Sequence, residues 1–129
     1  MAQFKVYGRA DELRPVRTEL SDLLHRAAVD VLGLPVDKRF HRFFPMDPED
    51  FPTPAGRSAR YTVVEVVLFP GRSVATKKAF LRRVFADARA QLGLDPVDLE
   101  VVLMEPPRHD WGIRGLPGDE LDLPYRVDV

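Results

Sequence analysis

The sequence contains no cysteine among its 129 residues. It therefore cannot form disulfide bonds, supply a thiolate nucleophile or build a zinc site from cysteine ligands. Histidine is also scarce, and His25, His41 and His109 do not share the short spacings that are typical of metal ligands. Phosphate-binding and dinucleotide-binding glycine motifs and a serine nucleophile elbow are missing as well. We therefore expect neither a metal nor another cofactor.

The chain also lacks an excess of either charge. Its 19 Lys and Arg residues and 20 Asp and Glu residues leave a formal net charge of -1, which favours neither nucleic acid nor an acidic membrane as a partner. No apolar run approaches the roughly 20 residues that cross a bilayer, and no signal peptide precedes the first predicted strand. These absences predict a soluble, cytoplasmic protein with no nucleic-acid or membrane partner.

Residues 60–105 have the pattern of a complete β-α-β unit. Tyr61–Phe69 is rich in β-branched and aromatic residues and ends at a Pro-Gly pair, which is typical of a buried central strand. Apolar residues recur at helical spacing over Ala75–Leu92, and Gly93 supplies a helix stop. Leu99–Leu103 then predicts a second strand, parallel to the first.

Residues 1–46 repeat this plan in a weaker form. Phe4–Tyr7 predicts a strand, Asp11–Leu32 an amphipathic helix and Arg39–Phe44 a second strand. A Gly-Arg pair precedes the helix and a Gly-Leu pair follows it in both units. One such unit has too little surface to bury a core, but two side by side form a four-stranded sheet with two helices on one face.

The predicted fold is therefore a single α+β domain, residues 1–129, built from a tandem β-α-β repeat. Residues 106–129 form a tail that is rich in proline and glycine and holds Trp111, the only tryptophan. The strand around Val63, Glu65 and Val67 carries apolar groups on both faces, so the face without helices also needs cover. We expect an oligomer to bury it, and the alternative is a monomer whose tail covers it.

Two charged residues lie where elements of the two units end. Asp37 follows the stop of the first helix, and Arg72 precedes the second helix. The arginine fork matches a carboxylate in two-point contact, and an aspartate nearby can act as a base or hold a water. The alternative is that Asp37 caps a turn and Arg72 pairs with a neighbouring acid.

Three segments stand out, in this order along the chain: Gly33-Leu34-Pro35-Val36-Asp37-Lys38-Arg39-Phe40, Gly71-Arg72-Ser73 and Asp110-Trp111-Gly112-Ile113-Arg114-Gly115. Together with the tandem β-α-β plan they resemble the tautomerase superfamily, and most of all its malonate semialdehyde decarboxylase-like branch. The resemblance covers most of the chain, and it implies a homotrimer of β-α-β-β-α-β subunits with sites near the subunit edges.

In that family an N-terminal proline, exposed when the initiator methionine is removed, acts as the catalytic base or acid. Asp37 matches the family aspartate and Arg72 one of its carboxylate-binding arginines, while Pro70 stands where the other arginine falls. The proline itself is missing, because Ala2 follows Met1. Ala2 allows removal of Met1, which leaves a primary amine with an ordinary pKa of about 7.7 to 8.0. If Met1 is retained, the amine moves by about 3.3 to 3.6 Å of extended chain.

Two functional hypotheses follow from the resemblance. The first is an isomerase or lyase that acts on a small 2-oxo or 3-oxo carboxylate or its enol, by tautomerisation, decarboxylation or hydration. Arg72 would bind the carboxylate, Asp37 would orient water or move a proton, and Trp111 and Ile113 would wall the pocket. The second is a non-catalytic relative that binds a small carboxylate or a protein partner. A ferredoxin-like RNA-binding domain shares the element order, but residues 62–67 offer no aromatic stacking groups.

Overall fold

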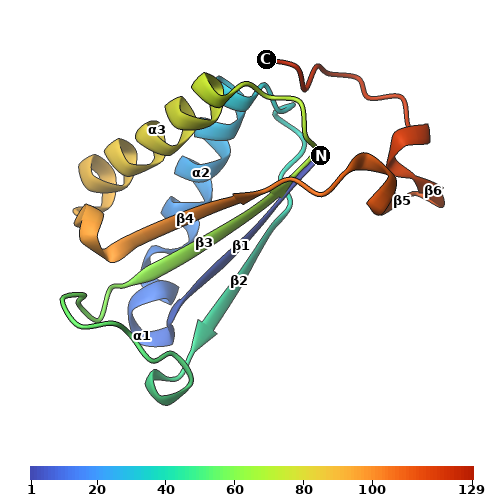
Figure 1. Cartoon of the computed structure of the whole chain (residues 1–129). Helices are drawn as coiled ribbons and strands as arrows, with labels where there is room; N and C mark the ends of the chain where they lie inside the picture. Colours follow the sequence, from blue (N-terminus) through green and yellow to red (C-terminus); the bar gives the residue numbers. More distant parts are fainter.

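The computed structural model describes residues 1–129, and its centre is a four-stranded mixed sheet (Figure 1). The strands lie in the order β2-β1-β3-β4, with β1 antiparallel to β3 and each outer strand parallel to its inner neighbour. Their bounds are β1 Ala2–Arg9, β2 His41–Met46, β3 Thr62–Leu68 and β4 Leu99–Met104. The two β-α-β units thus meet where β1 pairs with β3.

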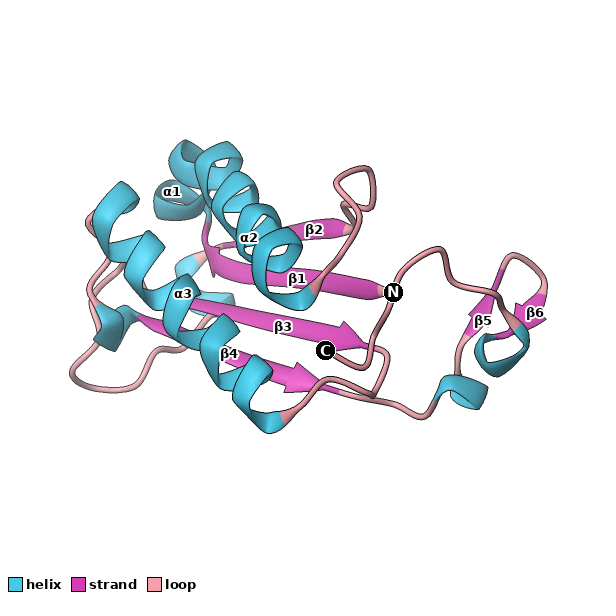
Figure 2. Ribbon diagram, turned by 90° about the horizontal axis from the view of Figure 1, so that it is seen from above, coloured by secondary structure: helices cyan, strands magenta, loops and turns pink.

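Two long helices, α2 Arg17–Leu32 and α3 Val74–Leu92, cover one face of this sheet (Figure 2). The helix predicted from Asp11 is broken: α1 covers Ala10–Leu13 and a 3-10 turn, η1, covers Arg14–Val16. Pro15 explains the break, because proline lacks the amide donor that a continuous helix requires. None of the helices is long and apolar enough to cross a membrane.

The hydrophobic core lies between the sheet and the two helices. Side chains along β1 and β3 alternate between buried and half-buried positions, and the buried set faces the helices. Val6, Val64 and Val66 from the strands and Phe80 and Val84 from α3 are fully buried in one cluster of 19 residues. This confirms the α+β arrangement with both helices on one face.

The opposite face of the sheet carries half-buried and exposed apolar side chains. Val102 on β4 is 45% exposed and Phe44 on β2 is 37% exposed. Tyr7 stacks on Phe44 at 4.8 Å between ring centroids and donates a hydrogen bond to Glu65 at 2.7 Å. The face is therefore mixed in character, and it has no helix over it (Figure 2).

The C-terminal tail does not cover this open face, so the alternative in which the tail buries it is wrong, and burial by an oligomer stays a prediction. The Val129 carbonyl accepts a hydrogen bond from Ser73 at the start of α3, and the backbone of Val127 lies against Gly71. Before this return, a small hairpin of β5 Gly112–Ile113 and β6 Leu116–Pro117 extends beyond the end of the sheet (Figure 2). The remaining 3-10 turns are η2 Pro48–Asp50, η3 Pro96–Asp98, η4 Arg108–Asp110 and η5 Gly118–Glu120.

Candidate functional site

The chain terminus lies at one end of the sheet and opens into a small cavity. The Met1 carbonyl accepts a hydrogen bond from the Phe69 amide, so the terminus is fixed beside the end of β3. The cavity has a volume of about 140 Å³. Its lining combines the terminus, the segment after α2, the hairpin turn and the tail: Met1, Ala2, Leu34, Lys38, Phe40, Arg114, Leu123, Pro124 and Tyr125.

The terminal amine of Met1 lies at this cavity with a shifted pKa. Its pKa is lowered from 8.0 to about 5, mainly by burial and in addition by the charges of Arg72 and Arg108. The amine also contacts the hydroxyl of Tyr125, and burial raises the pKa of that hydroxyl. At neutral pH the amine is therefore unprotonated and able to accept a proton, while the Tyr125 hydroxyl keeps its own.

Arg72 is buried just behind the terminus, with 4% of its surface exposed. Its Nε donates to the Leu32 carbonyl at 2.9 Å and its Nη1 lies 3.5 Å from the Phe69 carbonyl, while Nη2 is buried without a partner. The guanidinium therefore acts on the amine by its charge and ties α2 to the end of β3. It does not line the cavity, so its role in binding a carboxylate stays a prediction.

Several cationic side chains lie around the cavity, whereas only Arg72 had been predicted there from the sequence. Lys38 and Arg114 line it, and Arg108 is held by the Gly118 and Leu121 carbonyls and lies 4.9 Å above the Phe69 ring. Arg114 has a φ of 50°, in the left-handed region, and begins the two-residue turn between β5 and β6. Gly115, which follows with a φ of 84°, was the one feature of the sequence that indicated a tight turn here, because such hairpin turns favour glycine.

The sequence reasoning missed Tyr125 and Arg108. Tyr125 lies 124 positions from Met1 along the chain, and no spacing rule joins two residues so far apart. Its aromatic ring packs against the core, which brings the hydroxyl to the terminus. Trp111 was predicted to wall the pocket, but Tyr125 is the aromatic residue of the tail that lines the cavity.

The other predicted site residues lie around the cavity rather than in it. Asp37 is exposed in the turn after α2, next to Lys38. Trp111 is buried edge-on against Phe69 at 4.9 Å and donates from Nε1 to the Pro106 carbonyl. Ile113 is half-buried in β5, next to Arg114. Only Ala2 of the predicted set lines the cavity, and the structure has no group of three or more His, Asp or Glu placed to share a metal.

Comparison with solved structures places this fold among tautomerases. A malonate semialdehyde decarboxylase, known in wild-type, mutant and inactivated forms, superposes with a TM-score of 0.76 at 24% identity, over 84% of this chain and 88% of that chain. The FG41 malonate semialdehyde decarboxylase inhibited by 3-bromopropiolate gives a TM-score of 0.73 at 28% identity, over 95% and 99%. Native fused 4-OT gives 0.79 at 22% identity, over 92% and 98%.

The family comparison agrees with these superpositions. The Tautomerase_2 family, described as tautomerase enzymes, matches residues 38–114. This range begins directly after Asp37 and includes Arg72 and the Trp111 segment, which carried the resemblance in the sequence. The match covers more than half of the chain, and the fold agrees with the superposed structures. The chain therefore belongs to the tautomerase family.

Proposed function

We propose that this protein is a tautomerase-type enzyme that acts on a small 2-oxo or 3-oxo carboxylate or its enol, with a primary terminal amine in place of the family proline. The observation that supports this most directly is the position of the Met1 amine, half-buried in a cavity beside the Tyr125 hydroxyl. In ketonisation the neutral amine takes the proton from the enol oxygen as the carbonyl forms, and as the ammonium ion it returns a proton to the carbon of the former double bond that does not bear the oxygen. The same group thus serves as base and then as acid.

The charges around the cavity support a carboxylate as the substrate. Lys38 and Arg114 line the cavity from two sides, and neither forms an ion pair within the chain. An anion that enters can therefore pair with both without displacing an acidic side chain. Asp37, exposed beside Lys38, is proposed to orient water or to move a proton when decarboxylation or hydration is the reaction.

We also propose that the protein works as a homotrimer. The 4-OT relatives include one whose structure is described as an asymmetric trimer, with a TM-score of 0.79 at 20% identity. In this chain the sheet face without helices exposes Val102 and Phe44, and the β5–β6 hairpin, which directly follows Trp111 and contains Ile113, extends past the sheet (Figure 2). Packing of copies against these surfaces would bring Trp111 and Ile113 toward a site, as the resemblance implies.

A non-catalytic role in binding a small carboxylate is the second candidate, and two observations favour it. Ala2 replaces the family proline, and its side chain is buried at 2% exposure as the first residue of β1. Arg72 directs its Nε to a backbone carbonyl and not into the cavity. In a binding protein Lys38 and Arg114 would still pair with the carboxylate of the ligand, and no catalytic base would be needed.

Ketonisation of phenylenolpyruvate tests the proposal. The wild type is compared with Ala2→Pro, Tyr125→Phe and Arg114→Ala, with the first residue of each protein identified by intact mass. Arg89→Ala, an exposed arginine on α3 far from the terminus, is the matched control. We expect turnover by the wild type that falls in Tyr125→Phe and Arg114→Ala and persists in Arg89→Ala.

Two other outcomes separate the candidates. An inactive wild type that binds phenylpyruvate in an Arg114-dependent way identifies the binding protein, and activity gained by Ala2→Pro then shows that the pocket survives without its base. No turnover and no binding by the wild type refutes both candidates.

A further inference from the structure

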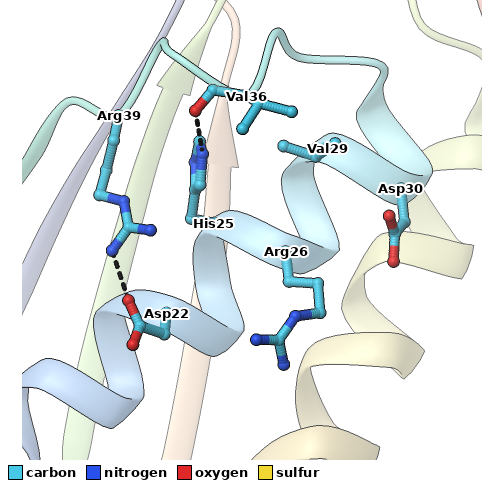
Figure 3. A pocket seen from close by; sticks show the side chains of 7 residues that line it. All are labelled: Asp22, His25, Arg26, Val29, Asp30, Val36 and Arg39. Atoms are coloured by element: carbon cyan, nitrogen blue, oxygen red, sulfur yellow. Dashed lines mark hydrogen bonds and ion pairs between the residues drawn. The ribbon is translucent and has the colours of Figure 1, made fainter.

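Helix α2 holds the segment Leu34–Phe40 through side chains from a single face. The segment leaves α2 through Gly33, whose φ is 72°, and ends where the Phe40 carbonyl accepts a hydrogen bond from the Phe4 amide. Between these fixed ends it has no regular structure apart from one turn. Two side-chain contacts join the segment to α2: Arg39 donates to Asp22 at 2.6 Å, and His25 Nε2 lies 2.7 Å from the Val36 carbonyl (Figure 3). Just beyond the segment, Ser21 Oγ lies 2.8 Å from Nδ1 of His41, the first residue of β2.

The segment Leu34–Phe40 separates two cavities, the one at the chain terminus and a groove beside α2. Leu34, Lys38 and Phe40 line the cavity at the chain terminus. Val36 and Arg39 line a groove of about 370 Å³ on the outer side of α2, together with Asp22 and His25 (Figure 3). A shift of the segment on the groove side therefore moves Lys38 and Phe40 in the terminal cavity.

His25 is the most deeply buried of the α2 side chains that make these contacts. The ion pair between Asp22 and Arg39 has side chains that are 49% and 42% exposed, and exposed pairs hold geometry weakly. His25 is only 6% exposed. The Val36 carbonyl can only accept, so Nε2 carries the proton and donates it, which leaves Nδ1 as an acceptor.

Nδ1 of His25 is buried without a hydrogen-bond partner, and this is unfavourable for folding. An apolar side chain of similar size would avoid that cost. The bond to Val36 is therefore the interaction that requires a donor at this position. Val36 directly precedes Asp37 and lies two residues from Lys38, so the bond fixes the turn that carries both.

We propose that His25 is a positioning residue: by donating to the Val36 carbonyl it sets the place of Lys38 and Asp37 and hence the affinity of the terminal cavity for a carboxylate. This inference rests on the proposed function for the part that concerns substrate. Through His25 the groove on α2 would influence the terminal cavity, although no residue of the groove lines that cavity.

The test compares His25→Leu with His25→Gln, whose amide can still donate from the place of Nε2, and with Asp22→Asn as a control for the exposed ion pair. Exchange of the Lys38 amide, which donates to the Pro35 carbonyl at 3.0 Å, reports on the turn by hydrogen exchange. Ketonisation of phenylenolpyruvate gives KM and kcat, and calorimetric titration of phenylpyruvate gives the affinity.

We expect His25→Leu to speed exchange at Lys38 and to raise KM by about fivefold, the size of one ordinary hydrogen bond, with kcat changed by less than about twofold. His25→Gln should restore the wild-type exchange rate at Lys38 and the wild-type KM. Asp22→Asn should change neither of these two quantities by more than about twofold.

Unchanged exchange at Lys38 in His25→Leu overturns the proposal, whatever the activity. Faster exchange with KM and affinity unchanged overturns the positioning role and leaves only a structural one. A wild type that neither turns over nor binds the probes refutes the proposed function and the link to substrate with it, and the exchange data then decide separately whether His25 holds the turn.

Discussion

The pKa of the terminal amine is the property on which the proposed chemistry depends most. With a pKa of about 5, about 1% of the amine is protonated at pH 7, whereas an exposed terminus with a pKa near 8 is about 90% protonated. Competitive acetylation of the amine across pH 3 to 10, followed by mass spectrometry of the N-terminal peptide, measures the midpoint. Intact mass first establishes that Met1 is present.

A variant with Gly-Ser added before Met1 provides the control, because the new amine lies in solvent. We expect a midpoint near 5 for the wild type and near 8 for the extended chain. The acid limb of kcat/KM for phenylenolpyruvate should follow the wild-type midpoint, since only the neutral amine accepts a proton. A midpoint near 8 in the unextended protein refutes the electrostatic reasoning.

The same shift makes stability depend on pH. Between about pH 5 and 8 the unfolded chain keeps a proton on its amine and the folded chain does not, so the unfolded state binds more protons and stability rises with pH. This contribution is lost as the pH falls from about 8 towards 5. Urea denaturation at several pH values should show a steeper rise for the wild type than for the extended chain, and identical slopes would contradict the assignment.

Three further predictions concern the fold. Phe80→Ala should lower the free energy of unfolding by about 3 to 5 kcal/mol, because Phe80 is fully buried against Phe4; urea denaturation measures this, and a loss below about 1 kcal/mol would contradict the packing. Gly118→Ala should release the hairpin and shift Trp111 fluorescence to the red, because a Cβ at Gly118 would lie 2.5 Å from the Arg108 carbonyl; Gly112→Ala, which meets nothing within 4 Å, is the control, and equal spectra would argue against the contact. Val102→Lys should shift a trimer toward monomer in light scattering if the open face is the interface, and an unchanged mass would place the interface elsewhere.

The fold could be predicted because the hydrophobic periods of the two units are strong. The errors in the predicted bounds of the first helix and of β2 came from proline residues. Pro15 breaks the first helix although the apolar stripe continues past it, and Pro45 lies within β2 although the predicted strand ended at Phe44. β2 is an edge strand, where a residue without an amide donor is tolerated. Hydrophobic periodicity alone could not show that one proline breaks its element and the other is accommodated within it.

The candidate site was harder to predict, because its parts come from distant positions and their orientation depends on packing. Sequence order placed Arg72 at the correct end of the sheet, but it could not show that the guanidinium turns inward to the Leu32 carbonyl. Tyr125 lies in a proline-rich tail without periodicity, and only the folded core directs its hydroxyl to Met1. Position in the chain pointed to Asp37 and resemblance to Ala2, and of these two only Ala2 lines the cavity.

The central place of β1 in the sheet has a consequence for how the chain is made. β1 leaves the ribosome first, yet its partners are residues 41–46 and 62–68, so the edge that pairs with β3 stays open until half of the chain has been synthesised. Domains fold as units during synthesis, and unpaired strands are exposed to aggregation in that interval. Lys5 and Arg9, on the side of β1 that faces away from the helices, place charges in this strand, the kind of residue that opposes aggregation of exposed apolar segments.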